Sequence, residues 1–411
     1  MAPNLTSISP SLSASQSGSK FGSKSAFSSE NWIHARQLFP GGGAAPLTDQ
    51  LLHISGDRIA AIGPASQMGP PPAAHFYDVV APGFIDLQIN GGGGVLFNDS
   101  PDLPAIDRIA AAARQGGACH ILPTFITAPE QDYCRAMEAV SSAADRPEIL
   151  GLHLEGPFLS PARAGIHHAD FMRQMGADDL AKLTGFHGRL LLTCAPEQVT
   201  LANIRALVDA GITIFAGHSD ADYKMMEEAI SAGLSGVTHL FNACSQLTAR
   251  APGIVGTALS DSRLYAGIIA DRHHVHDANL ILAVAQMQDR LCLVSDTMPS
   301  FGTNLSSFIL QGQEISVKEG RLVSAEGQLA GAHLGLDEAV RNIISVTHIA
   351  PEKALHMASG IPAKIVGLDS EYGAVQEGRL ASLTCLDKGL RPCCVYVHGT
   401  AYLPDTLDAV L

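Results

Sequence analysis

The chain has 411 residues, a formal net charge of −14 at pH 7 and 46% hydrophobic residues. This length allows two or three domains, of which an α/β barrel would take about 250 residues. The negative charge argues against nucleic-acid or membrane-surface binding, and no apolar run approaches the roughly 20 residues that span a bilayer. The expected partner is therefore a small molecule, and an anionic one is compatible with this charge because a binding site is local.

The N-terminal segment, residues 1–29, is rich in serine and contains no acidic residue. It has too few apolar residues to offset the entropy lost on ordering. It also lacks the apolar stretch of a signal peptide and the arginines of a transit peptide. We predict that this segment is a disordered extension.

Short β signals lie near both ends of the chain. Near the N-terminus they are 51–55 and 58–62, and near the C-terminus they are 381–386 and 394–398. Neither pair is large enough for an independent core. We therefore predict one small β-sandwich domain that combines residues 30–80 with residues 373–411.

Between these segments, residues 81–372 alternate apolar, strand-like runs with helical patterns. This alternation indicates βα units, and eight such units close a (β/α)8 barrel. An open, doubly wound sheet is the alternative. The eight runs are 83–90, 119–126, 149–158, 190–196, 212–219, 236–243, 265–271 and 291–296.

Eight cysteines are present, and none forms a C-x-x-C pair. Several lie within the apolar runs. This pattern predicts reduced, mostly buried thiols and a cytoplasmic location.

Polar or ionisable residues stand at the ends of most of the eight runs. In a barrel, the carboxyl ends of the strands converge on one mouth, so these side chains would share one site. Polar residues at strand ends are common, and only the set as a whole is informative. Its members are Gln88, Asn90, Glu155, His218, His239, Asp271 and Asp296.

Glu155, His218 and His239 form a His₂Glu set, which catalytic zinc uses with water in an open position. A divalent metal there would polarise a carbonyl and bring the pKa of its water to about 7. Asp296 would then be placed to take a proton from that water and return it to a leaving nitrogen. Singly, each residue has a structural alternative: a backbone-capping Glu, a hydrogen-bonded core His or an N-cap Asp. Their joint placement favours the metal site.

Six motifs follow one another in the order seen in a known family. They are Ala81-Pro-Gly-Phe-Ile-Asp-Leu-Gln-Ile-Asn-Gly91, Leu152-His-Leu-Glu-Gly-Pro-Phe158, Gly217-His-Ser-Asp-Ala-Asp-Tyr223, Thr238-His-Leu-Phe-Asn-Ala243, Ile269-Ala-Asp-Arg-His-His-Val275 and Leu293-Val-Ser-Asp296. On these motifs the chain resembles the N-acetylglucosamine-6-phosphate deacetylases of the metal-dependent amidohydrolase superfamily. The resemblance covers the chain from residue 45 to about residue 400.

This resemblance implies hydrolysis of N-acetylglucosamine 6-phosphate to glucosamine 6-phosphate and acetate. It assigns the metal to Glu155, His218 and His239, and the acid/base role to Asp296. His167 matches a histidine that holds the substrate amide and carbonyl. The matched sugar-phosphate contacts are Asn242, the backbone at Ala243, His274 and Arg250. The family also implies a two-fold homodimer in which Arg250 reaches the phosphate in the neighbouring subunit.

The chain departs from the pattern at three places. Gln88 and Asn90 replace the His-x-His that holds a second metal in many amidohydrolases. Because amides are poor metal ligands, we expect one divalent ion, zinc, and we count both amides as substrate-binding candidates. Arg272-His273 replaces the usual Gly-Leu before the matched histidine, and His333 replaces a usual Ser, so fine substrate preference stays open.

Two further functions remain as alternatives. One is deacetylation of a related N-acetylhexosamine phosphate or an N-acyl amino acid, which acetate release with and without the 6-phosphate would distinguish. The other is a catalytically silent barrel that serves as a binding scaffold. Loss of a ligand or of Asp296 would favour the scaffold, and all four residues are present.

Overall fold

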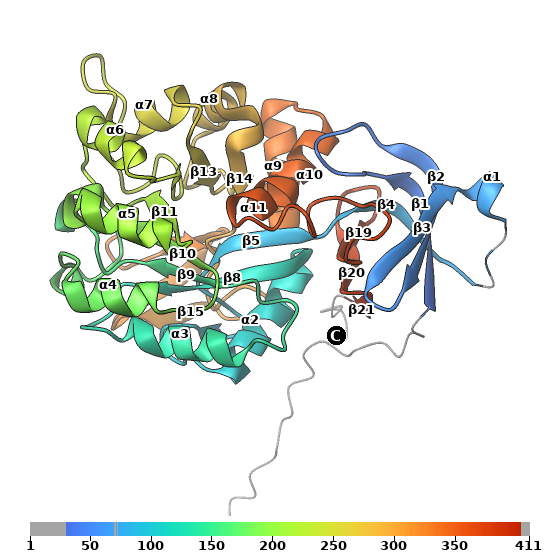
Figure 1. Ribbon diagram of the computed structural model, residues 1–411, viewed down its shortest axis with the longest axis horizontal. Coiled ribbons are helices and arrows are strands. Elements are labelled where there is room, and N and C mark those ends of the chain that lie inside the picture. The colour runs from blue at the N-terminus through green and yellow to red at the C-terminus, as the bar shows by residue number, and fades with distance from the viewer. Residues whose placement is uncertain (1–29, 70, 72, 404–411) are drawn as a thin grey trace, which may run out of the picture.

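Eight parallel strands form the centre of the computed structural model, which describes residues 30–69, 71 and 73–403 (Figure 1). The predicted disordered extension, residues 1–29, lies outside these residues. The strands follow the order β14-β13-β12-β11-β10-β9-β8-β5, and each coincides with one predicted run. Their bounds are β5 Phe84–Ile89, β8 Ala118–Ile126, β9 Leu152–Glu155, β10 Leu190–Cys194, β11 Thr213–Ala216, β12 Gly236–Val237, β13 Tyr265–Ile268 and β14 Leu291–Leu293.

The two outer strands of this order, β5 and β14, meet just beyond their carboxyl ends. The Asp296 N–H donates to the Gln88 carbonyl at 2.9 Å, and the Asn90 N–H donates to the Thr297 carbonyl at 3.0 Å. These bonds close the ring. The predicted barrel is therefore confirmed, and the open-sheet alternative is wrong.

Helices surround the barrel, and polar side chains start several of them (Figure 1). Asp102, Thr200 and Asp222 each accept a hydrogen bond from a backbone N–H three residues later, at 2.8–3.1 Å. Each cap supplies a partner that the first helical turn lacks. The helices are α2 Leu103–Gln115, α3 Tyr133–Ser142, α4 Ala177–Thr184, α5 Leu201–Asp209, α6 Tyr223–Ser231, α7 Gly253–Ser260, α8 Asp277–Met287, α9 Leu336–Thr347, α10 Pro351–Ala358 and α11 Gly360–Ile365.

Both ends of the described chain contribute to one seven-stranded sheet beside the barrel (Figure 1). Its order is β21-β20-β19-β4-β1-β2-β3, so β19 from the C-terminal part pairs directly with β4 from the N-terminal part. A core of its own lies against this sheet, with Ile33, Leu52 and Tyr396 fully buried. The strands are β1 Glu30–Leu38, β2 Leu47–Ser55, β3 Arg58–Pro64, β4 His75–Pro82, β19 Leu383–Leu386, β20 Pro392–Val397 and β21 Thr400–Tyr402, with a short helix α1 at Ala65–Met68.

A four-stranded antiparallel sheet, which the sequence did not predict, is inserted between β14 and α9. Its buried residues Leu310, Ile315 and Leu322 share a small core with Ile126 at the end of β8 and with Met298. This core holds the insertion over the barrel mouth. The strands are β15 Ser307–Leu310, β16 Gln313–Lys318, β17 Arg321–Val323 and β18 Leu329–Ala332, and a small hairpin pairs β6 Gly91–Gly92 with β7 Val95–Leu96.

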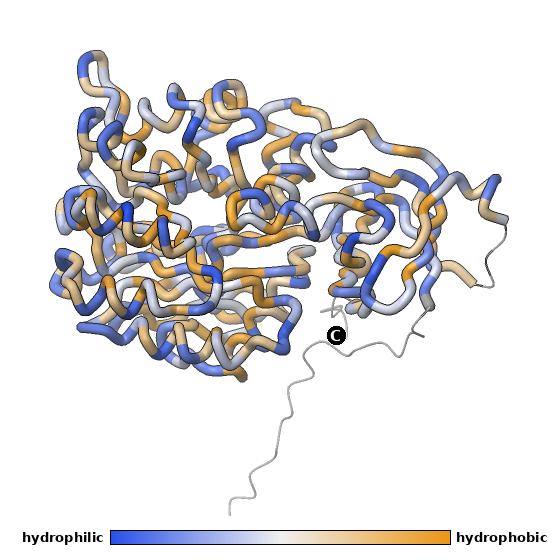
Figure 2. Tube along the Cα trace, viewed as in Figure 1, coloured by the Kyte–Doolittle hydropathy of each residue, from blue (hydrophilic) through white to orange (hydrophobic). Residues whose placement is uncertain are grey.

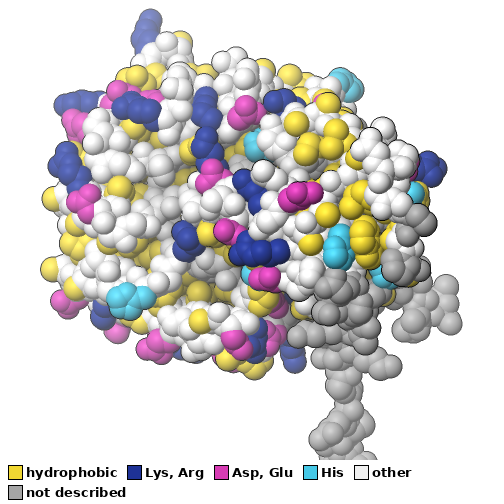
Figure 3. Space-filling view, turned by 45° about the vertical axis from the view of Figure 1, so that its right-hand side comes forward, with side chains coloured by type: hydrophobic (Ala, Val, Ile, Leu, Met, Phe, Trp, Pro, Cys, Tyr) yellow, Lys and Arg dark blue, Asp and Glu magenta, His cyan; other side chains and the backbone are white. Residues whose placement is uncertain are grey.

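Apolar residues concentrate on the barrel strands, as the colours of Figure 2 show. Every residue of β5 and of β8 is buried, as expected for strands that are covered by helices outside and packed with side chains inside. On the face in Figure 3, basic side chains lie among acidic ones, and such exposed pairs add little stability. Within the described residues, no helix combines the length and hydrophobicity that a membrane crossing requires.

His120 connects the barrel to the seven-stranded sheet. It lies on β8, is fully buried, and has hydrogen-bond partners on both ring nitrogens: the Pro147 carbonyl at Nδ1 and the Ser382 hydroxyl at Nε2, each at 2.8 Å. Burial, together with a smaller effect of the nearby His398, lowers the pKa of His120 to about 3. The imidazole is therefore held neutral, donating to the carbonyl and accepting from the hydroxyl.

This pKa predicts an acid-dependent loss of stability. Because the folded pKa lies below the unfolded value of about 6.5, the unfolded chain binds the proton first, and the free energy of unfolding falls as pH drops below about 6.5. At pH 4.5 the loss from this group should approach about 3 kcal/mol. Denaturant titrations at pH 7.5 and 4.5 would measure it. His120→Gln should be less stable at pH 7.5 and show a smaller difference between the two pH values, and an unchanged difference would exclude His120 as a source.

Candidate metal and catalytic site

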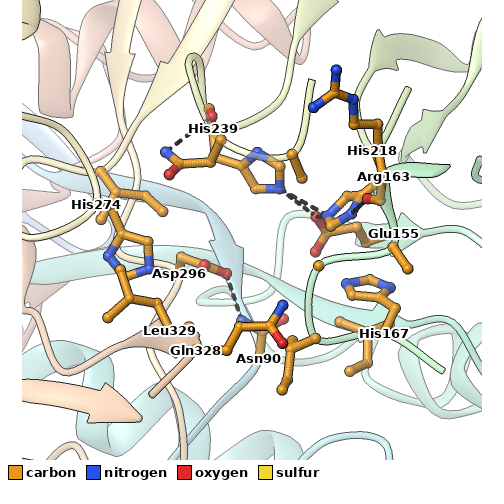
Figure 4. A pocket seen from close by; sticks show the side chains of 18 of the residues that line it. Asn90, Glu155, Arg163, His167, His218, His239, His274, Asp296, Gln328 and Leu329 are labelled. Carbon is orange, nitrogen blue, oxygen red and sulfur yellow. Dashed lines mark hydrogen bonds and ion pairs between the residues drawn. The ribbon is translucent and has the colours of Figure 1, made fainter. Parts of the chain in front are cut away.

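A pocket of about 430 Å³ opens at the carboxyl ends of the barrel strands. Figure 4 shows acidic, histidine and amide side chains from separate strand ends pointing into it. Its wall combines three parts: barrel strand ends, the loop after β9, and the inserted sheet. The lining residues from the first part include Asn90, Ile126, Glu155, His218, His239, Asn242, Ala243, Ile269, His274 and Asp296.

The strand-end residues enter the pocket through unusual backbone conformations. His218, His239 and Asp296 follow β11, β12 and β14 with φ angles of +46°, +31° and +50°. This left-handed region costs a non-glycine residue about 1–3 kcal/mol, and it persists only where the surrounding structure imposes it. All three departures from extended geometry turn a polar side chain toward one point, as expected where function determines the backbone.

The side chains of Glu155, His218 and His239 meet at their tips. The two imidazole Nε2 atoms lie 3.1 Å apart, and they lie 3.1 Å and 2.9 Å from Glu155 Oε1. Ligands at about 2.1 Å from a tetrahedral metal are themselves separated by about 3.4 Å. The spacing of these three atoms is thus close to that of a first coordination shell, and the His₂Glu chemistry fits a divalent ion.

The hydrogen bonds of His218 and the ionisation state of Glu155 are compatible with metal binding by both side chains. The Nδ1–H of His218 donates to the Arg163 carbonyl at 2.9 Å, which fixes the ring with Nε2 directed at Glu155. Burial alone would raise the pKa of Glu155, but hydrogen bonds from His218 and His239 outweigh burial and hold that pKa well below its usual range. The carboxylate of Glu155 is therefore ionised at neutral pH.

A second histidine grouping overlaps the first. Single ligand atoms of Glu155, His167 and His218 lie within 4.8 Å of one another. His167 is more loosely placed than His239, and its Nδ1 is already 3.0 Å from the Thr127 hydroxyl. Burial and the proximity of His218 lower the pKa of His167 to about 3. This geometry favours His239 as the third ligand and leaves His167 as a neutral imidazole beside the set.

Asp296 is held by two amides from β5 and the residue after it. Its Oδ1 accepts from Asn90 Nδ2 at 2.7 Å and from Gln88 Nε2 at 3.1 Å, and the same Gln88 nitrogen lies 3.2 Å from Glu155 Oε2. Burial, together with the charge of Glu155, raises the pKa of Asp296 to about 6. Near neutral pH such a carboxyl can both accept and donate a proton.

The remaining predicted substrate contacts divide into two groups. Asn242, Ala243 and His274 line the pocket, and His274 is fixed by a 2.7 Å contact from Nδ1 to Asp271. Gln88 and Arg250 do not line it. Gln88 lies behind the carboxylates, and Arg250 is exposed on a loop between β12 and α7.

Apart from His167, two parts of the wall were absent from the sequence prediction. The loop after β9 contributes Arg163, whose backbone carbonyl orients His218, and a carbonyl contact leaves no trace in residue type. The inserted sheet contributes Gln328, Leu329 and Gly331. These residues follow no strand of the barrel, so the rule that locates barrel sites at strand ends could not find them.

A family model described as the amidohydrolase family matches residues 79–406. The N-acetylgalactosamine-6-phosphate deacetylase of Escherichia coli O157:H7 is 33% identical over 361 residues, covering 86% of this chain and 94% of that protein. The N-acetylglucosamine-6-phosphate deacetylase of Homo sapiens is 34% identical over 339 residues, covering 78% and 82%. The crystal structure of N-acetylglucosamine-6-phosphate deacetylase from Pasteurella multocida aligns over 91% of this chain and 100% of its own, with a TM-score of 0.86 and 30% identity. The chain therefore belongs to the amidohydrolase family.

Proposed function

We propose that the protein hydrolyses the acetamide of N-acetylglucosamine 6-phosphate, giving glucosamine 6-phosphate and acetate. The observation that carries this proposal is the meeting of Glu155, His218 and His239 within 3.1 Å, beside Asp296 in one pocket. Relatives named for this reaction support it. N-acetylgalactosamine 6-phosphate is the second candidate, because a relative of similar identity is named for that epimer.

Glu155, His218 and His239 would hold one divalent ion, for which we propose zinc. Two imidazole nitrogens and an ionised carboxylate are ligands that suit zinc, and when bound the ion would polarise the acetyl carbonyl and favour deprotonation of the attacking water. A second ion is not expected, because the neighbouring amides of Gln88 and Asn90 are engaged as donors to Asp296.

The other residues of the pocket bind the sugar phosphate and move the proton. Asp296 would take a proton from the attacking water and give it to the leaving nitrogen, while His167 holds the acetyl group. His274 and the backbone N–H of Ala243, which also line the pocket, would bind the phosphate group of the sugar. Among the described residues no acceptor meets that N–H, which leaves it free for a phosphate oxygen.

Acetate release from a panel of substrates tests the proposal. The panel contains the gluco and galacto N-acetyl 6-phosphates, both sugars without phosphate, and an N-acyl amino acid. We expect turnover of the phosphorylated sugars and a large preference for the 6-phosphate over the plain sugar. Equal turnover with and without phosphate would exclude an amino-sugar phosphate as the substrate class. No acetate from any member, with the metal present, would leave the scaffold function.

We further propose a cytoplasmic homodimer in which Arg250 serves the neighbouring site. All eight cysteines are free thiols and six are buried, in keeping with a reducing compartment. Arg250 has no hydrogen-bond or ion-pair partner among the described residues of its own chain. Its loop is stiffened by hydrogen bonds between Thr248 and Ala251, and exposed Leu247 lies beside it. An apolar residue next to an unpaired cation suits an interface.

Mixing two impaired variants tests whether Arg250 reaches the neighbouring site. Arg250→Ala should raise KM, because it removes an ion pair with the phosphate that is worth about 2–5 kcal/mol of binding free energy if the pair is buried. The variant should keep its metal. Mixed with Asp296→Asn chains, it should form dimers with one intact site and one doubly altered site. Equal random mixing should restore about a quarter of wild-type sites at low substrate. No recovery, in a sample shown to contain mixed dimers, would place Arg250 outside the neighbouring site.

A further inference from the structure

The side-chain oxygen of Asn90 is a buried acceptor without a partner. Asn90 is 1% exposed and lines the pocket, and its Oδ1 meets no donor among the described residues. The orientation of the amide is fixed, because its other end faces Asp296 Oδ1 at 2.7 Å. A carboxylate oxygen accepts, so that end must be the NH₂ group, and the carbonyl oxygen must point away from Asp296.

A buried acceptor that stays unsatisfied costs about 1–3 kcal/mol, and buried polar groups in folded proteins are nearly always paired. Gln88 makes the contrast clear. It bonds the same Asp296 oxygen from behind, but it does not line the pocket. The Asn90 oxygen is a buried, unpaired acceptor on a residue that lines the pocket. It therefore calls for a donor from the ligand.

The position of Asp296 identifies that donor. For Asp296 to protonate the leaving nitrogen, this nitrogen must lie within hydrogen-bond reach of the carboxyl group. Asn90 is bonded to that carboxyl group, so its oxygen borders the same point (Figure 4). The acetyl carbonyl is an acceptor and the methyl group is apolar. The N–H of the acetamide is the donor that the substrate offers at this point.

We propose that Asn90 Oδ1 accepts the N–H of the scissile amide. This inference rests on the proposed deacetylase function. In the reaction, water adds its oxygen to the acyl carbon, one proton passes through Asp296 to the nitrogen, and the C–N bond breaks. The original N–H bond is kept throughout. Asn90 holds this N–H on one side of the nitrogen while the developing lone pair turns toward Asp296.

The test uses two non-hydrolysable inhibitors that differ in one group. In the first, a methylphosphonamidate replaces the acetamide and keeps the N–H. In the second, the matching phosphinate has CH₂ in its place. Calorimetry gives the affinity of each for the metal-loaded wild type, for Asn90→Leu and Asn90→Ala, and for Gln88→Met as a matched control that removes the other amide donor to Asp296.

We expect the wild type to prefer the N–H inhibitor by about tenfold to a hundredfold, the usual result of leaving a buried acceptor unpaired. In the Asn90 variants the preference should fall to near one, whereas Gln88→Met should keep it even if both affinities drop. Either Asn90 variant suffices if the other fails to fold. A wild-type preference near one, or a preference that survives in the Asn90 variants, overturns the inference. The proposed function fails separately, by absence of acetate release from the wild type.

Discussion

Replacing Asp296 by asparagine is expected to lower kcat by about 10²–10⁴-fold, the usual contribution of a general acid–base group. Asparagine has the same shape, and its oxygen can still accept from the amides of Asn90 and Gln88. The pocket should therefore persist, while the proton acceptor is lost. Steady-state kinetics, metal analysis and substrate binding would measure the three quantities on one sample.

Two other outcomes would change the role of Asp296. If the variant lost its metal, Asp296 would be a ligand first and a proton carrier second. If turnover stayed within a few-fold of wild type, Asp296 would have no part in the chemistry. Retained metal and binding with a large loss of kcat would be the signature of a group that acts in the transition state.

Removal of the metal is expected to abolish turnover. Elemental analysis should find one tightly held ion per chain, and a chelator that removes it should remove all acetate release, with recovery on addition of zinc. His239→Ala deletes one of the three proposed ligands, so it should lose the ion and should not recover with zinc. His120→Gln deletes a buried histidine elsewhere in the barrel and should keep one ion, which controls for general damage to the fold.

Finding two tightly held ions per active chain would contradict the single site. It would mean that the amides of Gln88 and Asn90 release Asp296 to bind a second cation. Activity that survives complete metal removal would contradict the proposed chemistry altogether. Neither result would alter the fold.

The barrel could be predicted because its strands are continuous apolar runs. Such runs arise when a strand is buried on both faces, and they stand out without any knowledge of the tertiary structure. The inserted sheet could not be predicted in this way. Its strand β16, Gln313–Lys318, has only Ile315 fully buried, and part of its core is supplied by Ile126 and Met298 from other segments. A strand that depends on distant partners leaves a weak local signal.

The meeting of side chains in one pocket was predictable where residue type and strand end coincide, as at Glu155, His218 and His239. It was not predictable where the role depends on orientation. Nothing in the sequence shows that the Asn90 amide faces Asp296 with its NH₂ group and leaves its oxygen unpaired, or that Gln88 lies behind the carboxylates. These facts follow from the neighbour at the other end of each amide, which only the folded chain supplies.

The hydrogen bonds that close the barrel between β5 and β14 have a consequence for refolding. They join Gln88 to Asp296, which are separated by 208 positions in the chain, whereas successive barrel strands are separated by far shorter loops. Contacts of such long sequence separation carry the largest loop-closure entropy and tend to form late. Asp296, which we propose as the proton carrier, is thus part of the joint that is expected to form last. A chain with most of its secondary structure regained but this joint still open would be inactive, and turnover would report on completion of the barrel.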